Sequence, residues 1–165
     1  MLVLGVDPGT RNMGWGVIDV EGTRLTHVAH GIIRAKDTLS LAERLEILDD
    51  GLHAVLERHP PQEAAVETLF FARDASAAGK LGHARGVVLL RLRRERVAIF
   101  EYAPATVKRA VGAHGQAQKA QVASMVAALL RLRDVPAADA GDALAIAITH
   151  VQSALVRRLS EATRR

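Results

Sequence analysis

The 165-residue sequence contains no cysteine, which excludes disulfide bonds and thiolate metal sites and fits a cytosolic protein. Its apolar runs are far shorter than the roughly 18 residues of a membrane-spanning helix. The N-terminus lacks a basic region followed by a long apolar stretch and a cleavage site, so no signal peptide is expected. The sequence therefore predicts one cytoplasmic domain over residues 1–155, without membrane association, followed by a basic, flexible tail at residues 156–165.

Aromatic residues are also scarce, with only five in the chain. The charged residues are unevenly distributed along the sequence. Residues 1–72 contain 6 Lys or Arg against 11 Asp or Glu, a net charge of −5. Residues 73–165 contain 16 against 7, a net charge of +9. A basic half joined to an acidic half suggests a polyanionic substrate held near a metal site. A solvated basic surface explains the same charges equally well, so charge alone does not distinguish a polyanion-binding site from an ordinary surface.

Hydrophobic patterning predicts an α/β fold with a mixed, five-stranded sheet flanked by helices. Strands are expected at about 2–7, 15–20, 25–34, 64–69 and 97–102, and helices at about 41–58, 74–94, 104–110, 118–130 and 139–155. Short connections make the first three strands antiparallel, whereas the later strands follow helical crossovers and should be parallel. A capping box from Ser40 to Glu43 marks the start of the first helix.

Four carboxylates occupy positions that a two-metal nuclease requires. Asp7 and Glu67 each end a predicted buried strand, and Asp139 and Asp142 open the last helix on one face. Carboxylates are rarely buried unpaired, and a shared divalent metal would pair them. Phosphodiester hydrolysis needs an activated water and a stabilised leaving group, which two divalent ions about 4 Å apart can provide. Oxygen ligands favour Mg²⁺ or Mn²⁺.

Each of these carboxylates also has an ordinary explanation. Asp7 precedes Pro8-Gly9 and could be a turn residue, and Glu67 could form a salt bridge to an arginine. Asp139 could be a helix N-cap, and Asp142 would be favoured by the helix dipole. The four together are harder to explain in this way than any one alone.

Four segments carry a family resemblance that extends from about residue 2 to residue 152. They read GVDPGT with GWG at 5–16, AVETLFF with KLGHARGV at 65–87, FEYAPATVK at 100–108 and ADAGDALAIAITH at 138–150. These segments resemble the RuvC family of Holliday-junction resolvases. The resemblance implies a ribonuclease-H-like fold, a homodimer, and symmetric cutting of four-way DNA junctions. It also implies partnership with the RuvA–RuvB branch-migration complex in bacterial recombination and DNA repair.

The resemblance assigns catalytic and metal-binding roles to Asp7, Glu67, Asp139 and Asp142, with two Mg²⁺ or Mn²⁺ ions per active site. Residues 73–119 hold ten Lys or Arg but only three acids, which suits salt-sensitive phosphate contacts. The candidate DNA contacts are Phe70, Phe71, Arg73, Lys80, Arg85, Lys108 and Lys119. The resemblance points to Lys108 and Lys119 near the scissile phosphate.

The resemblance also points to Phe70 as a wedge or stacking residue at the junction centre. Solvated lysines, and one core phenylalanine of the adjacent pair Phe70 and Phe71, are the ordinary alternatives. Small residues on the 74–94 helix form a stripe: Ala75, Gly79, Gly82 and Gly86. Glycine weakens a helix by roughly 1 kcal/mol relative to alanine, so close approach of another backbone is expected. The candidates are a dimer partner's equivalent helix, packing within the monomer, or DNA.

Three other functions stay open on the residues alone. The Asp7-Pro8-Gly9-Thr10 segment also resembles the phosphate loop of the sugar kinase, actin and heat-shock ATPase group, although a single domain with a basic half suits that group poorly. A RuvC-like nuclease acting on pre-ribosomal RNA or a flap is another possibility, and a non-catalytic junction-binding protein is the third. Converging carboxylates argue against a pure binder. His114 is expected to be a loop residue, and His150 is expected to lie on the surface of a helix or to have a packing role.

Overall fold

The computed structural model describes residues 1–68, 75–112 and 119–162. Its elements, in chain order, are β1 (Leu2–Asp7), β2 (Asn12–Glu21), β3 (Arg24–Arg34), α1 (Leu41–Arg58), β4 (Glu63–Glu67), α2 (Ala75–Arg94), β5 (Ala98–Tyr102), α3 (Pro104–Ala110), α4 (Lys119–Leu129) and α5 (Ala138–Ala162). The strands form a five-stranded sheet in the order β3-β2-β1-β4-β5. β2 pairs antiparallel with both β1 and β3, whereas β4 pairs parallel with β1 and β5. The predicted mixed sheet is confirmed.

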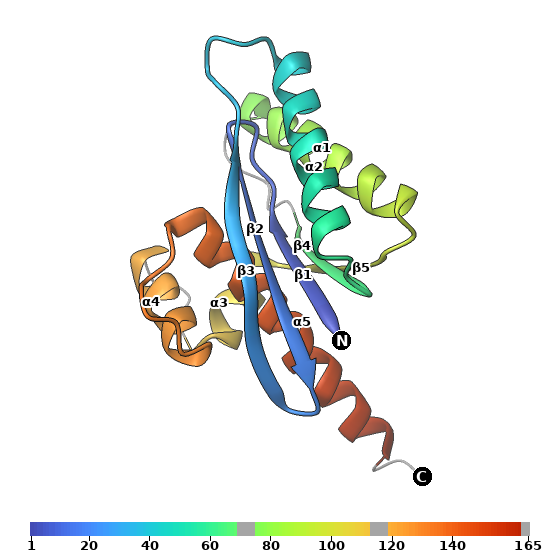
Figure 1. The fold of residues 1–165 in the computed structure, drawn as a ribbon, viewed down its shortest axis with the longest axis vertical. Helices are drawn as coiled ribbons and strands as arrows, with labels where there is room; N and C mark the ends of the chain where they lie inside the picture. Colours follow the sequence, from blue (N-terminus) through green and yellow to red (C-terminus); the bar gives the residue numbers. More distant parts are fainter. Residues whose placement is uncertain (69–74, 113–118, 163–165) are drawn as a thin grey trace.

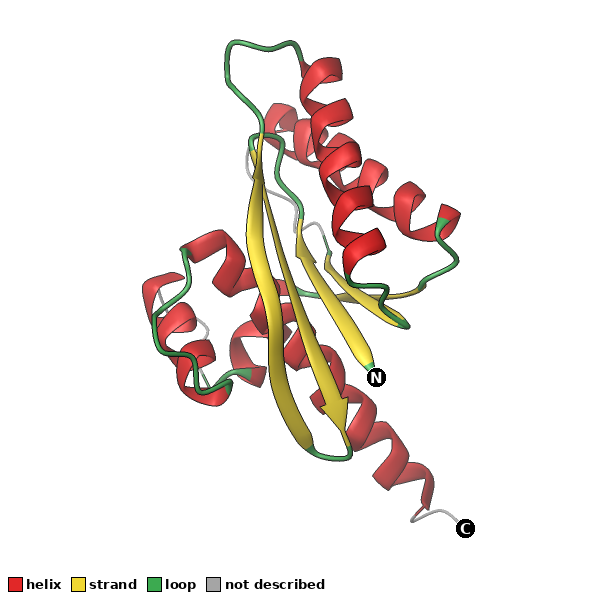
Figure 2. Cartoon of the chain, in the orientation of Figure 1, coloured by secondary structure: helices red, strands yellow, loops and turns green. Residues whose placement is uncertain are grey.

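Helices cover the sheet on both faces, with α1 and α2 on one side and α3, α4 and α5 on the other (Figure 2). β1 lies at the centre of the sheet, which explains its continuous apolar sequence. Successive side chains of a strand alternate between the two faces. Leu4 and Val6 accordingly pack in the core under α1 and α2, and Val3 packs in the core under α5. By the same alternation, Asp7 is on the α5 face.

The first helix starts as the sequence predicted. The Ser40 Oγ accepts a hydrogen bond from the Glu43 backbone N–H at 3.3 Å, and the Ser40 N–H donates to the Glu43 carboxylate at 2.7 Å. The helix ends at Arg58. α1 is tied to α2 by Arg91, whose Nε donates to the Asp49 carboxylate at 2.8 Å. This hydrogen bond from Arg91 lowers the pKa of Asp49.

The largest difference from the predicted elements concerns α5. It extends to Ala162, whereas the sequence predicted an end near Leu155 and a tail from residue 156. Leu159 and Ala162 continue the helical spacing of Val151 and Leu155, and no Gly or Pro interrupts the chain there, so the sequence is compatible with the longer helix. Flexibility of residues 156–165 stays a prediction. Other element ends differ by three residues at most, within the usual uncertainty of boundaries. Of the helices in the described ranges, none is both long and apolar enough to cross a membrane.

Candidate active site

Two of the predicted carboxylates lie at the ends of neighbouring parallel strands. Asp7 ends β1 and Glu67 ends β4, and the residues just before them, Val6 and Val66, are paired in the sheet. The two acids therefore leave the same edge of the sheet one strand spacing apart, about 4.8 Å between backbones. Both are half-buried. A strand end of this kind is a rigid support for a ligand, because the backbone is fixed by its neighbours on both sides.

The other two carboxylates reach this edge because α5 lies directly against the sheet. Gly14 is the cross-strand partner of Asp7, and a Cβ placed on it would stand 2.0 Å from the carbonyl oxygen of Asp139. A Cβ on Gly5 would stand 1.9 Å from the carbonyl oxygen of Ala143. Only glycine allows such an approach of helix backbone to strand backbone. These glycines thus place the first turns of α5 beside the end of β1.

The result is a compact acidic group. One carboxylate oxygen from each of Asp7, Asp139 and Asp142 lies within 4.8 Å of the others, and all three side chains are half-buried. Like charges this close repel one another, and a divalent cation with hard oxygen ligands would relieve the repulsion. The donor set therefore fits Mg²⁺ or Mn²⁺. The N-cap explanation of Asp139 is wrong, because α5 begins at Ala138 and Asp139 already lies in its first turn.

Glu67 lies outside this three-residue group but lines the same cleft. The cleft has a volume of about 220 Å³ and is lined by Asp7, Glu67, Pro104, Val107, Lys108, Val122 and Asp142. Lys108 comes from α3, which follows directly after β5 and begins with Pro104. The cleft thus contains the predicted lysine together with three of the four predicted acids, and Asp139 adjoins them through Asp7 and Asp142.

Arg85, another predicted DNA contact, supports the strand that carries Glu67. Its Nε donates a hydrogen bond to the backbone carbonyl of Glu67 at 3.3 Å, and its guanidinium forms an ion pair with Glu101. The contact with Glu67 is therefore to the backbone. Its role toward DNA stays a prediction.

The remaining predicted contacts are only partly placed. Lys80 is exposed on α2, where it lines a different hollow. Lys119 begins α4, but its side chain is not described. Phe70, Phe71 and Arg73 lie outside the described residues, as does His114.

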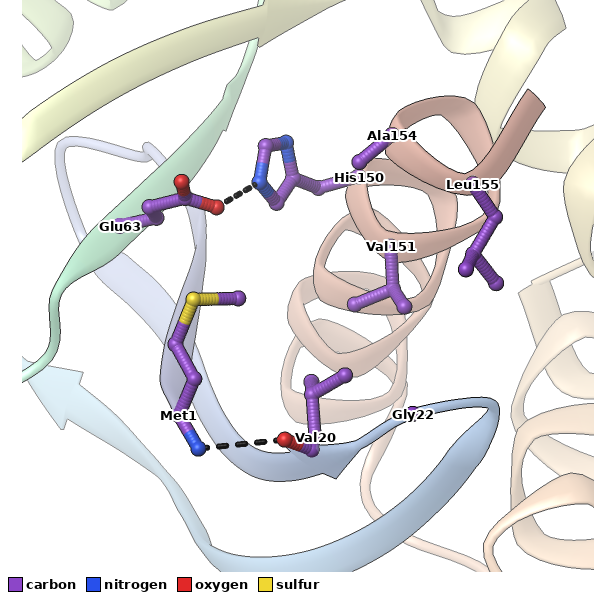
Figure 3. A pocket seen from close by; sticks show the side chains of 8 residues that line it. All are labelled: Met1, Val20, Gly22, Glu63, His150, Val151, Ala154 and Leu155. Atoms are coloured by element: carbon purple, nitrogen blue, oxygen red, sulfur yellow. Dashed lines mark hydrogen bonds and ion pairs between the residues drawn. The ribbon is translucent and has the colours of Figure 1, made fainter. Parts of the chain in front are cut away.

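His150 belongs to a buried network that sequence reasoning missed. Its ring is 1% exposed and hydrogen-bonds through Nδ1 to the Tyr102 hydroxyl at 2.8 Å and through Nε2 to the Glu63 carboxylate at 2.6 Å. Figure 3 shows the histidine of α5 and Glu63 of β4 pointing toward each other. The ring of Phe100 lies against the histidine at a centroid distance of 4.4 Å. The expected packing role is confirmed, and the helix-surface alternative is wrong.

This network stands apart from the acidic cleft, since Glu63 and Glu67 lie at opposite ends of β4. It joins α5 to β4 and β5, so it fixes the helix against the sheet. A histidine spaced at the apolar interval of a helix is the only signal for it in the sequence. Its partners, 48 and 87 residues away, cannot be read from that spacing.

A mixed five-stranded sheet, with acids at the ends of its central strands and at the start of the helix packed on it, is the arrangement that a metal-dependent nuclease of the ribonuclease-H-like type requires. The family described as crossover junction endodeoxyribonuclease RuvC matches residues 3–150. A crossover junction endodeoxyribonuclease RuvC of Sorangium cellulosum is 56% identical over 154 residues, covering 93% of this chain and 86% of its own length. Its counterpart in Rhodopseudomonas palustris (strain TIE-1) is 51% identical over 148 residues, covering 90% and 85%. The chain belongs to the RuvC family, and the expected enzyme class, an endodeoxyribonuclease, is confirmed.

Solved structures agree with the family. RuvC of T. thermophilus in complex with Holliday junction substrate superposes with a TM-score of 0.85 at 36% identity, covering 93% of this chain and 94% of that chain. The yeast mitochondrial Holliday junction resolvase Ydc2 has a TM-score of 0.63 at 14% identity, covering 89% and 76%, which shows a shared fold only. The ribonuclease-H-like fold is therefore confirmed.

Proposed function

We propose that this chain resolves four-way DNA junctions by paired, symmetric nicks, in recombination and repair. The observation that carries the proposal is the convergence of Asp7, Asp139 and Asp142 within 4.8 Å, in a cleft that also contains Glu67 and Lys108. The chain's membership of the RuvC family supports the reaction class. The T. thermophilus relative, solved in complex with Holliday junction substrate, supports the substrate.

The four carboxylates would hold two Mg²⁺ or Mn²⁺ ions, which when bound activate a water for in-line attack and stabilise the leaving 3′ oxygen, giving 5′-phosphate ends. The chain's own contribution is ligand geometry. Asp7 is fixed by the central strand, and Asp139 and Asp142 are fixed by the contact between α5 and the glycines of β1 and β2. Lys108 would contact the scissile phosphate and neutralise charge that develops on its oxygens.

A homodimer would place two such sites symmetrically, as paired nicks in a two-fold symmetric junction require. Its candidate interface is the small-residue stripe of α2. A Cβ on Gly79 or Gly86 would meet nothing within 4 Å, so packing within the described part of the monomer does not explain these glycines. Gly86→Leu is expected to make the protein sediment as a monomer. A variant that stays dimeric would exclude this face of the helix.

DNA contacts through Phe70, Phe71, Arg73, Lys80, Arg85 and Lys119 complete the proposal. We further propose a cytoplasmic location and partnership with a RuvA–RuvB complex. Phe70→Ala is expected to weaken cleavage far more than binding, because a wedge acts on the opened junction and not on the duplex arms. Unchanged cleavage would exclude the wedge.

The test of the proposed function compares a four-way junction having a mobile core with duplexes of the same sequences. Each is incubated with Mg²⁺, Mn²⁺ or EDTA, and Asp7→Asn serves as the matched control. Symmetric nicks confined to the junction, dependent on metal and absent in Asp7→Asn, are the expected result. Tight binding without cleavage under either metal would replace the enzyme with a junction-binding protein. A chain that neither binds nor cleaves the junction would act on another substrate, and RNA and flap substrates would then be tested in the same way.

A further inference from the structure

A second hollow, lined by cations, opens next to the loop that follows Asp7. Its volume is about 330 Å³, and its lining residues are Thr10, Arg11, Arg44, Lys80 and Leu81. Three of these five side chains are cationic, and none of the described residues that line the hollow is acidic. The volume far exceeds the roughly 30 Å³ that one water takes up in the liquid, so the hollow can admit a larger group.

The hollow lies at the catalytic edge of the sheet. Thr10 and Arg11 follow β1, Arg44 lies in the first turn of α1, and Lys80 lies in α2. Figure 1 shows β1 running toward the end of the molecule at which α1 and α2 start. Thr10 is three residues after Asp7. Three residues of extended chain span at most about 11 Å, so the backbones of Asp7 and Thr10 lie within about 11 Å of each other.

The guanidinium of Arg44 is the strongest indication that the hollow binds a ligand. Its Nε is buried and has no hydrogen-bond partner among residues 1–68, 75–112 and 119–162. Burial without a partner is unfavourable for a guanidinium nitrogen, and the first turn of a helix is an unfavourable place for a cation. Among the described residues, no hydrogen-bond acceptor is supplied to this Nε atom. An anion in the hollow would supply one.

The other lining groups suit the same anion. Arg11 pairs with Asp37 at 2.6 Å, but the two side chains are 65% and 58% exposed, so the pair is weak and can be exchanged. Lys80 is exposed, and Thr10 adds a hydroxyl donor. Guanidinium, ammonium and hydroxyl donors together match the oxygens of a phosphodiester, which carries one negative charge.

We propose that this hollow binds a backbone phosphate of the DNA strand that enters the acidic cleft, near the scissile phosphate. The inference rests on the proposed function, since it requires DNA in the cleft. Arg44 and Lys80 would contact the same phosphate from α1 and α2. The contact would fix the strand along its length without touching the reacting atoms.

The test measures junction binding by fluorescence anisotropy in EDTA, which prevents cleavage, over a range of KCl concentrations. Arg44→Gln is expected to weaken binding roughly tenfold and to make the log–log salt dependence shallower by up to about 0.9, the value for complete loss of one phosphate contact, because Lys80 still contacts the same phosphate. Arg58→Gln is the matched control, because Arg58 is exposed at the opposite end of the same helix. Thermal unfolding without DNA should show Arg44→Gln to be no less stable than the wild type.

The double variant Arg44→Gln/Lys80→Gln tests whether the two residues share one phosphate. Sharing predicts a loss smaller than the sum of the two single losses, whereas separate phosphates give additive losses and overturn the proposal. A wild-type salt dependence in Arg44→Gln, or an equal change in Arg58→Gln, would also overturn it while leaving the proposed function intact. If the wild-type protein does not bind the junction at all, the proposed function and the phosphate site fall together.

Discussion

Gly14→Ala tests whether close approach of α5 sets the ligand geometry. The new Cβ would lie 2.0 Å from the Asp139 carbonyl oxygen, while ordinary contact begins near 3.4 Å, so helix and strand must separate by roughly 1.4 Å. Metal–ligand distances tolerate changes of only about 0.2 Å. We expect junction cleavage to fall by about 100-fold or more, the effect of an ångström-scale misplacement. Single-turnover cleavage across a Mg²⁺ or Mn²⁺ titration measures this loss.

A loss of stability must be separated from this effect. Overpacking of this kind costs about 1–3 kcal/mol, so unfolding should be measured in EDTA, where metal binding cannot mask it. Gly51→Ala is the matched control, since its Cβ would meet the Ile33 side chain at 2.6 Å on the other face of the sheet. That variant should lose stability and keep its cleavage rate. Cleavage by Gly14→Ala within threefold of the wild type would refute the geometric argument.

Three further predictions concern charge and burial. Asp7→Asn should unfold at the same or a higher temperature than the wild type in EDTA, because it removes repulsion within the acidic group; clear destabilisation would contradict this. His150→Phe should lower the unfolding free energy by about 2–4 kcal/mol in urea, since it leaves two hydrogen-bond partners unpaired, while cleavage per folded molecule is retained. Burial lowers the pKa of His27 and of His30 below 6.5, and His30 lowers that of His27 further. At these two histidines the folded chain then binds fewer protons than the unfolded chain. The free energy of unfolding should therefore be at its full value above pH 6.5 and should fall as the pH drops below 6.5, less steeply in His30→Gln. Urea titrations at several pH values measure this, and an equal dependence on pH in the wild type and in His30→Gln would exclude these histidines as the cause.

Much of the fold could be predicted from the sequence because local patterns determine it. The apolar run of β1, the capping box of α1 and the proline that begins α3 each act over a few residues. The candidate metal ligands could also be predicted, since an acid after a buried strand is unusual wherever it occurs. Their arrangement in space was harder to predict, because Asp7 and Asp139 are 132 residues apart and only tertiary packing brings them together.

Features that depend on two distant segments escaped prediction. Gly14 and Gly16 lie inside a strand, which is a sign of close backbone approach, but the sequence does not say which element approaches. The partners of His150 come from two other elements. Arg44 looks like an ordinary surface residue of an amphipathic helix until the hollow around it is seen.

The distribution of the ligands along the chain has a consequence for synthesis. Asp7 lies in the first strand, but Asp139 and Asp142 lie in the last described helix, so a chain interrupted before residue 138 lacks half of the acids. The growing chain therefore cannot assemble the acidic site until α5 has emerged and docked on β1. A metal ion that binds only when α5 is docked on β1 would also favour docking, because its ligands come from both the first strand and the last described helix. Slower hydrogen exchange in β1 and α5 on addition of metal would be the signature of this coupling.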